Sequence, residues 1–68
     1  MNFMDAVMNM VNGKRLIRTG WSGMYLSILN NQNYIWSIGN GSEKPILNAT
    51  LYMPSIEDIQ ANDWIVKL

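Results

Sequence analysis

Three observations predict an α+β domain, with an N-terminal helix packed on an antiparallel sheet of about five strands. An apolar stripe at helical spacing opens the chain. Short segments that alternate apolar and polar residues follow it, separated by turns rich in Gly, Asn and Ser. A short helical turn is predicted before the last strand. The length of 68 residues fits a single domain spanning 1–68.

The first helix is predicted to begin after Asn2, whose side chain can cap it, with Asp5 at the third helical position. Its apolar positions recur at helical spacing and comprise Phe3, Val7, Met10 and Val11, with Met4 and Met8 widening the stripe. Asn12 and Gly13 predict its end, because Gly takes the left-handed cap conformation without strain.

The sheet is predicted from alternation and turn residues. The expected strands are residues 14–18, 24–29, 34–38, 46–52 and 63–68, with turns at 30–33 and 39–42. Trp21 is expected in a corner between the first two strands, because Gly and small polar residues flank it. Ser55 is expected to cap the late helical turn, with Asp58 at its third position and Asn62 at its end.

Composition excludes several classes of function. Five basic and five acidic residues cancel, which argues against binding a nucleic-acid polymer through its phosphates. No apolar stretch is long enough to span a membrane. There is no Cys and no His, so disulfides and the usual zinc sites are excluded, and no cofactor is expected. A chain this short with half its residues apolar is therefore expected to self-associate.

The sequence predicts a protein that is not an enzyme and has no catalytic residue. General acid–base catalysis usually uses His, which is absent, or a carboxylate in a shifted environment. Glu57 and Asp58 are adjacent, so their side chains point to different sides of a helical turn. The serine hydroxyls have no evident base to activate them.

The aromatic and charged residues divide into core and binding candidates. Trp64 alternates with Val66 and is expected in the core, whereas Trp36 fits either the core or a subunit contact. For Trp21, packing over the helix at the corner between strands and contacting a ligand are equally consistent with the sequence. Other open assignments are Arg18 (solvated strand end or anion contact), Tyr52 (core or cleft), and Ser55 and Asp58 (helix cap or ligand contact).

Both ends of the chain resemble a small phage and prophage family. The matching residues are Asn2-Phe3, Ala6, Gly13-Lys14, Arg18, Gly20-Trp21 and Gly23 near the start, and Pro54, Ser55, Asp58, Ala61, Asp63 and Trp64 near the end. The family includes the second type of Thoeris anti-defence protein, phage sponges that sequester cyclic ADP-ribose signals of bacterial TIR enzymes. Some relatives also take up cyclic oligonucleotides, and another branch is similar to an anti-CRISPR inhibitor.

The resemblance implies a homotetramer in the host bacterial cytoplasm that binds a small cyclic nucleotide signal in pockets between subunits. It implies ligand-binding roles for Arg18, Gly20, Trp21, Tyr52, Ser55 and Asp58, with the two aromatic rings stacked on a base and Arg18 facing phosphate. The middle region, from about Leu29 to Leu47, is shorter than in relatives, which often carry Trp where Tyr52 stands. A protein-binding inhibitor and a small structural phage protein are the alternatives.

Overall fold

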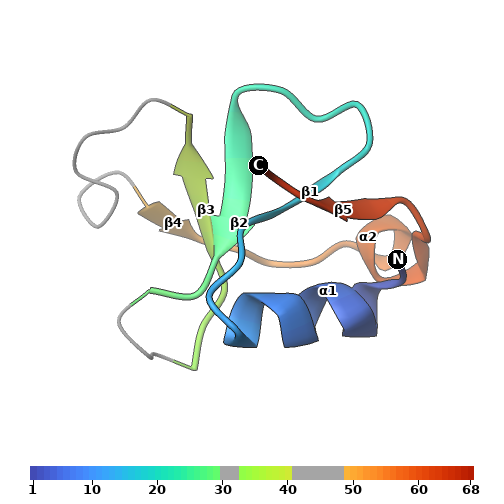
Figure 1. The fold of residues 1–68 in the computed structure, drawn as a ribbon. Helices are drawn as coiled ribbons and strands as arrows, with labels where there is room; N and C mark the ends of the chain where they lie inside the picture. The colour runs from blue at the N-terminus through green and yellow to red at the C-terminus, as the bar shows by residue number, and fades with distance from the viewer. Residues whose placement is uncertain (30–32, 41–48) are drawn as a thin grey trace.

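The computed structural model describes residues 1–29, 33–40 and 49–68 and has the predicted α+β architecture (Figure 1). Its elements in chain order are α1 (Phe3–Val11), β1 (Leu16–Arg18), β2 (Met24–Ser27), β3 (Trp36–Gly39), β4 (Ala49–Leu51), α2 (Ile56–Gln60) and β5 (Trp64–Val66). The strands are shorter than the sequence predicted. The turn predicted at 30–33 and the loop at 39–42 lie largely outside the described residues, as does the start of the strand predicted from Ile46. No described helix is long and apolar enough to cross a bilayer.

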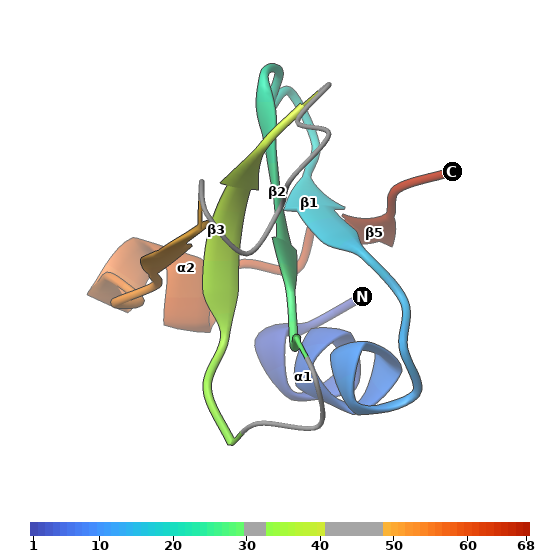
Figure 2. The ribbon, with the colours of Figure 1, turned by 90° about the vertical axis from the view of Figure 1, so that its left-hand side faces the viewer.

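The five strands form one antiparallel sheet in the order β4-β3-β2-β1-β5 (Figures 1 and 2). The last strand therefore pairs with the first, so that the two ends of the chain meet. Leu16 of β1 lies opposite both Leu26 of β2 and Val66 of β5. Arg18, two residues further along β1, lies opposite Trp64. Because side chains two residues apart share a face, this register puts Leu16, Leu26 and Trp64 on the side that faces α1.

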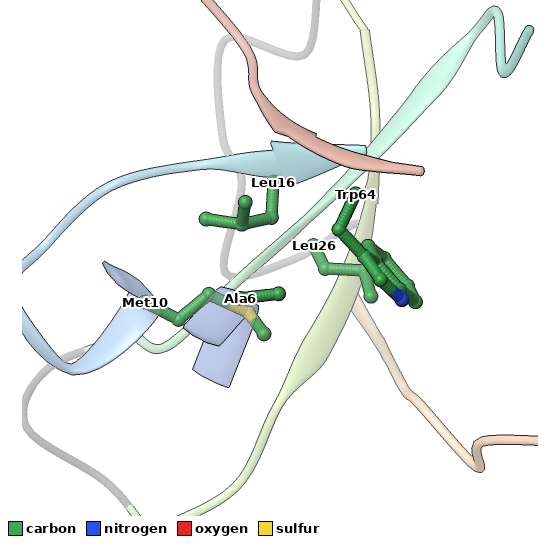
Figure 3. Packing of buried hydrophobic residues seen from close by; sticks show 5 residues of the cluster. All are labelled: Ala6, Met10, Leu16, Leu26 and Trp64. Atoms are coloured by element: carbon green, nitrogen blue, oxygen red, sulfur yellow. The ribbon is translucent and has the colours of Figure 1, made fainter. Parts of the chain in front are cut away.

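The core lies between α1 and this face of the sheet. Figure 3 shows Leu16, Leu26 and Trp64 projecting from the strands toward Ala6 and Met10 of the helix. All five side chains are almost fully buried. Phe3 packs against Trp64, with 5.6 Å between the ring centroids. Trp64 is thus the central core residue, as its alternation with Val66 predicted.

The ends of α1 follow the sequence prediction closely. The Asn2 side chain accepts a hydrogen bond of 2.8 Å from the Asp5 backbone N–H. At the other end, the N–H groups of Gly13 and Lys14 donate to the carbonyls of Met10 and Asn9, respectively, each at 3.0 Å. This pair of bonds is a Schellman motif, and it requires the left-handed φ of 87° that Gly13 adopts.

The predicted apolar stripe of α1 was wrong in part. Val11 was expected inside, with Met4 and Met8 at the margin, but all three are more than half exposed. Ala6 is instead completely buried. A small residue lets the helix approach the strands closely, and this rotates the buried face toward Ala6 and Met10. Met4, Met8 and Val11 then form a second stripe that faces away from the sheet.

The opposite face of the sheet also buries side chains. Tyr25 of β2 lies opposite Ile38 of β3, and Ile38 in turn lies opposite Ala49 of β4. Ile38 is fully buried and Tyr25 nearly so. Trp36, on the same face, is half-buried, while Tyr34 precedes β3 and is exposed.

Candidate functional site

The candidate site forms where the end of β1 meets the start of β5. Arg18 is the last residue of β1, and its cross-strand partner is Trp64. The N–H and hydroxyl groups of Thr19 both donate to the Asp63 carbonyl, each at 3.0 Å. Two bonds to one carbonyl fix the chain just before β5 against the chain just after β1. This arrangement places Asp63 beside Arg18.

Arg18 contacts two carboxylates from different segments. Its Nε lies 2.9 Å from Oδ1 of Asp63, and its Nη1 lies 3.1 Å from Oδ1 of Asp58 on α2. The Tyr52 hydroxyl donates to the other oxygen of Asp58. Four side chains thus form one connected polar network. The network ties α2 and the segment before it to the edge of the sheet.

The local sequence explains why Asp58 reaches this position. The Ser55 hydroxyl caps α2 by accepting a hydrogen bond of 3.1 Å from the Asp58 backbone N–H. The Asp58 carbonyl accepts a bond of 3.0 Å from the indole Nε1 of Trp64. None of the five residues of α2 is buried. Polar contacts centred on Asp58 therefore contribute much of what holds this helix in place. The helix ends at Ala61, which has an extended conformation, rather than at Asn62 as predicted.

The network shifts the protonation equilibria of its members. Burial of the Asp58 carboxylate would by itself raise its pKa, but hydrogen bonds from Tyr52 and Arg18 outweigh that effect and hold the pKa below its usual value. The hydrogen bond from Arg18 lowers the pKa of Asp63. Burial, followed by the hydrogen bond to Asp58, raises the pKa of Tyr52. At neutral pH both carboxylates are ionised and the tyrosine keeps its proton.

An aromatic pair borders this network. Trp21 packs edge-on against Trp64, with ring centroids 5.4 Å apart and planes at 74°. The backbone N–H of Trp21 donates to the Arg18 carbonyl at 3.0 Å, across a turn in which Gly20 has a φ of 91°. A side chain at position 20 would be strained there, so the glycine determines how Trp21 leaves β1. Trp21 is half-buried and keeps part of its ring accessible.

The structure brings the sequence-predicted residues together at one end of the sheet. Arg18, Tyr52 and Asp58 belong to the polar network, Ser55 joins it through the Asp58 N–H, and Gly20 positions Trp21. Their ligand-binding roles stay predictions. Sequence reasoning gave no role to Asp63, although its place directly before Trp64 was a usable signal. In the described part of the chain, no cluster of three or more potential metal ligands occurs.

The charge balance of the network bears on the expected phosphate contact. The single cation of Arg18 faces the two anions of Asp58 and Asp63. The three side chains together carry one net negative charge, which repels a phosphate. The arrangement suits hydrogen-bond donors, such as sugar hydroxyls and base N–H groups, better than it suits an anion.

One comparison with known proteins gives the family. A family model described as the Thoeris anti-defense 2-like domain matches residues 1–67. The chain therefore belongs to this family, in agreement with the resemblance of its two ends. A search of curated proteins found no match.

Proposed function

We propose that this member of the Thoeris anti-defense 2-like family is a phage immune-evasion sponge. In this proposal the protein binds a cyclic nucleotide-type defence signal, a cyclic ADP-ribose isomer or a cyclic oligonucleotide, and sequesters it without cleaving it. The supporting observation is the position of Trp21, held edge-on against a buried Trp64 beside the network of Arg18, Asp58 and Tyr52. A fixed aromatic ring next to fixed polar groups suits recognition of a nucleoside.

We assign the base and sugar of the ligand, rather than its phosphates, to this network. The accessible part of Trp21 would stack on a base, which contributes about 1–3 kcal/mol. Asp63, whose side chain is 40% exposed, can accept bonds from ribose hydroxyls. The Arg18 guanidinium has five N–H groups, and contacts to the two carboxylates use only three of them. The phosphates would then lie outside the network, against cations of another subunit or in solvent.

Binding without turnover fits the chemistry of these side chains. A general acid at neutral pH needs a raised carboxyl pKa, but the pKa values of Asp58 and Asp63 are both lowered. The raised pKa of Tyr52 keeps its hydroxyl protonated at neutral pH, so it is a weak acid and no phenolate is available as a base. The network therefore offers hydrogen bonds to a ligand but no group ready to transfer a proton.

We further propose that the protein acts as a homotetramer in the host bacterial cytoplasm, where its signal is made. Two contacting helices expose apolar side chains that an isolated chain of this size leaves uncovered. They are Met4, Met8 and Val11 on α1, with Ile56 and Ile59 on α2 and Met53 just before it. Because α2 also supplies Asp58, a subunit covering this surface would lie close to the site. Light scattering tests the assembly, and a mass of 7.8 kDa for the folded protein would contradict it.

Calorimetry with cyclic ADP-ribose isomers and cyclic oligonucleotides tests the sponge directly. We expect tight binding to the unmodified protein and about 5- to 150-fold weaker binding to Trp21→Ala, which is the loss of one stacked base. Tyr34→Ala is the matched control, since Tyr34 is an exposed aromatic outside the network. The ligand should be recovered intact after denaturation. A hydrolysed product at more than one turnover per site would identify an enzyme instead.

The exposed apolar surface supports one alternative, a protein-binding inhibitor of the anti-CRISPR type. Such an inhibitor would bind none of these small molecules. Substitutions at Met8 or Ile56 would abolish its activity, whereas Trp21→Ala would leave that activity intact. Calorimetry that detects no small-molecule binding, with inhibition lost on substituting Ile56, would favour the inhibitor.

A further inference from the structure

A second cluster of charged and aromatic side chains lies on the face of the sheet opposite α1. The guanidinium carbon of Arg15 lies 5.2 Å from the centroid of the Tyr25 ring, and Nζ of Lys67 lies 5.6 Å from the same centroid. Tyr25 neighbours Leu26, which faces the helix, so its ring points to the other side of the sheet. Two cations thus converge on one aromatic ring, on the face of the sheet that does not pack against α1.

The backbone sets these two cations directly opposite each other. The Lys67 N–H donates to the Arg15 carbonyl at 2.8 Å, extending the β1–β5 ladder by one position beyond the pair of Leu16 and Val66. Like charges directly opposite on neighbouring strands destabilise a sheet. The electron-rich face of Tyr25 offsets part of this repulsion, because aromatic rings attract cations.

An anionic partner would offset the rest of the repulsion, and no side chain in the described part of the chain supplies one. Within residues 1–29, 33–40 and 49–68, the ion pairs all involve Arg18, and no carboxylate pairs with Arg15 or Lys67. The acidic residues there lie on α1, on α2 and just before β5. Among the described residues no carboxylate accepts from these two side chains, so Arg15 and Lys67 present two positive charges to an external anion.

We propose that Arg15 and Lys67, supported by the ring of Tyr25, form an anion-binding site for a phosphate monoester. The charge matches, since a phosphate monoester carries nearly two negative charges at pH 7. The chemistry also matches, because the planar fork of Arg binds two phosphate oxygens while Lys supplies a compact charge. A carboxylate would neutralise only one of the two cations. The site is separate from the polar network around Arg18, whose net negative charge repels phosphate, and it does not depend on the proposed sponge activity.

The test is an NMR titration of the full chain with inorganic phosphate, AMP and adenosine at low ionic strength. We expect inorganic phosphate and AMP to shift the Tyr25 ring resonances, and adenosine to leave them unchanged. The double variant Arg15→Gln, Lys67→Gln should bind phosphate at least about tenfold more weakly, through loss of charged hydrogen bonds. Lys14→Gln is the matched control, because it removes a neighbouring exposed cation that does not contact Tyr25.

Several outcomes would overturn the proposal. If chloride at equal ionic strength shifts the Tyr25 ring resonances as strongly as phosphate does, the shifts come from charge screening and not from a phosphate site. Phosphate could shift Trp21 rather than Tyr25, or the double variant could bind as well as the unmodified protein. The phosphate-induced shifts of the Tyr25 and Trp21 resonances in the unmodified chain test the proposal even if the double variant fails to fold. Trp21→Ala should retain phosphate binding, so that failure of the sponge proposal and failure of this one are distinguishable.

Discussion

Replacing Trp64 by Ala tests the assignment of core against site. The Trp64 side chain is completely buried between α1 and the sheet, and its indole N–H bonds the Asp58 carbonyl. Truncation of a buried Trp costs about 3–5 kcal/mol through lost burial and the remaining cavity. The Asp58 carbonyl also loses the shorter of its two hydrogen bonds and keeps only the one from the Ala61 N–H at 3.4 Å, which adds about 1 kcal/mol. A domain of 68 residues is stable by roughly 3–10 kcal/mol. Trp64→Ala should therefore remove about half of the free energy of unfolding or all of it.

Trp21→Ala is the matched control for this prediction. Trp21 is half-buried and meets Trp64 edge-on, an arrangement that contributes about 0.5–1.5 kcal/mol beyond its buried area. The Trp21 variant should stay folded with a modestly lower stability and should lose ligand affinity. Urea unfolding followed by far-UV circular dichroism, at one fixed protein concentration, compares the two variants. If Trp64→Ala keeps the normal unfolding midpoint while Trp21→Ala unfolds, the assignment of core and site is reversed.

Three further predictions concern the network and the turn. The pKa values of Asp58 and Asp63 are lowered in the folded protein, so the unfolded chain binds protons first as the pH falls, and the stability of the fold should drop below about pH 4. Urea unfolding midpoints measured between about pH 3 and 7 test this, and Asp58→Asn should make them depend less on pH. The raised pKa of Tyr52 means that its stabilising effect is present below about pH 10 and is lost as pH rises further; melting temperatures should show a smaller alkaline loss in Tyr52→Phe. Gly20→Ala should cost about 1–2 kcal/mol in urea unfolding, because the added Cβ meets nothing within 4 Å and only the left-handed φ is strained; a similar cost in Gly39→Ala, where φ is not positive, would contradict this reason.

Local features of the chain were predictable because short stretches of sequence encode them. The caps at Asn2 and Ser55 depend on a side-chain oxygen and an N–H three residues away. The end of α1 depends on the permissive backbone of Gly13. Strand positions followed from alternation, and the burial of Trp64 followed from its place in that pattern. The family was also recognisable from the residues at the two ends of the chain.

The buried face of α1 was only partly predictable. Two stripes at helical spacing compete on this helix, one through Phe3 and Met10 and the other through Met4, Met8 and Val11. Hydrophobicity alone favours neither. The close approach of the helix to the strands selects the stripe that contains the small residue Ala6, and that approach is a property of the packed structure.

The sequence by itself determined the composition of the site, because it placed Arg18, Trp21, Tyr52 and Asp58 among a few chemically capable side chains. Only the tertiary structure decided how they combine. Arg18 and Asp63 are 45 positions apart and meet because β5 pairs with β1 at the sheet edge. That strand order sets the charge of the site, since it brings two carboxylates to one guanidinium. Pairing between distant strands depends on how the whole sheet packs on α1, and no local stretch of sequence encodes it.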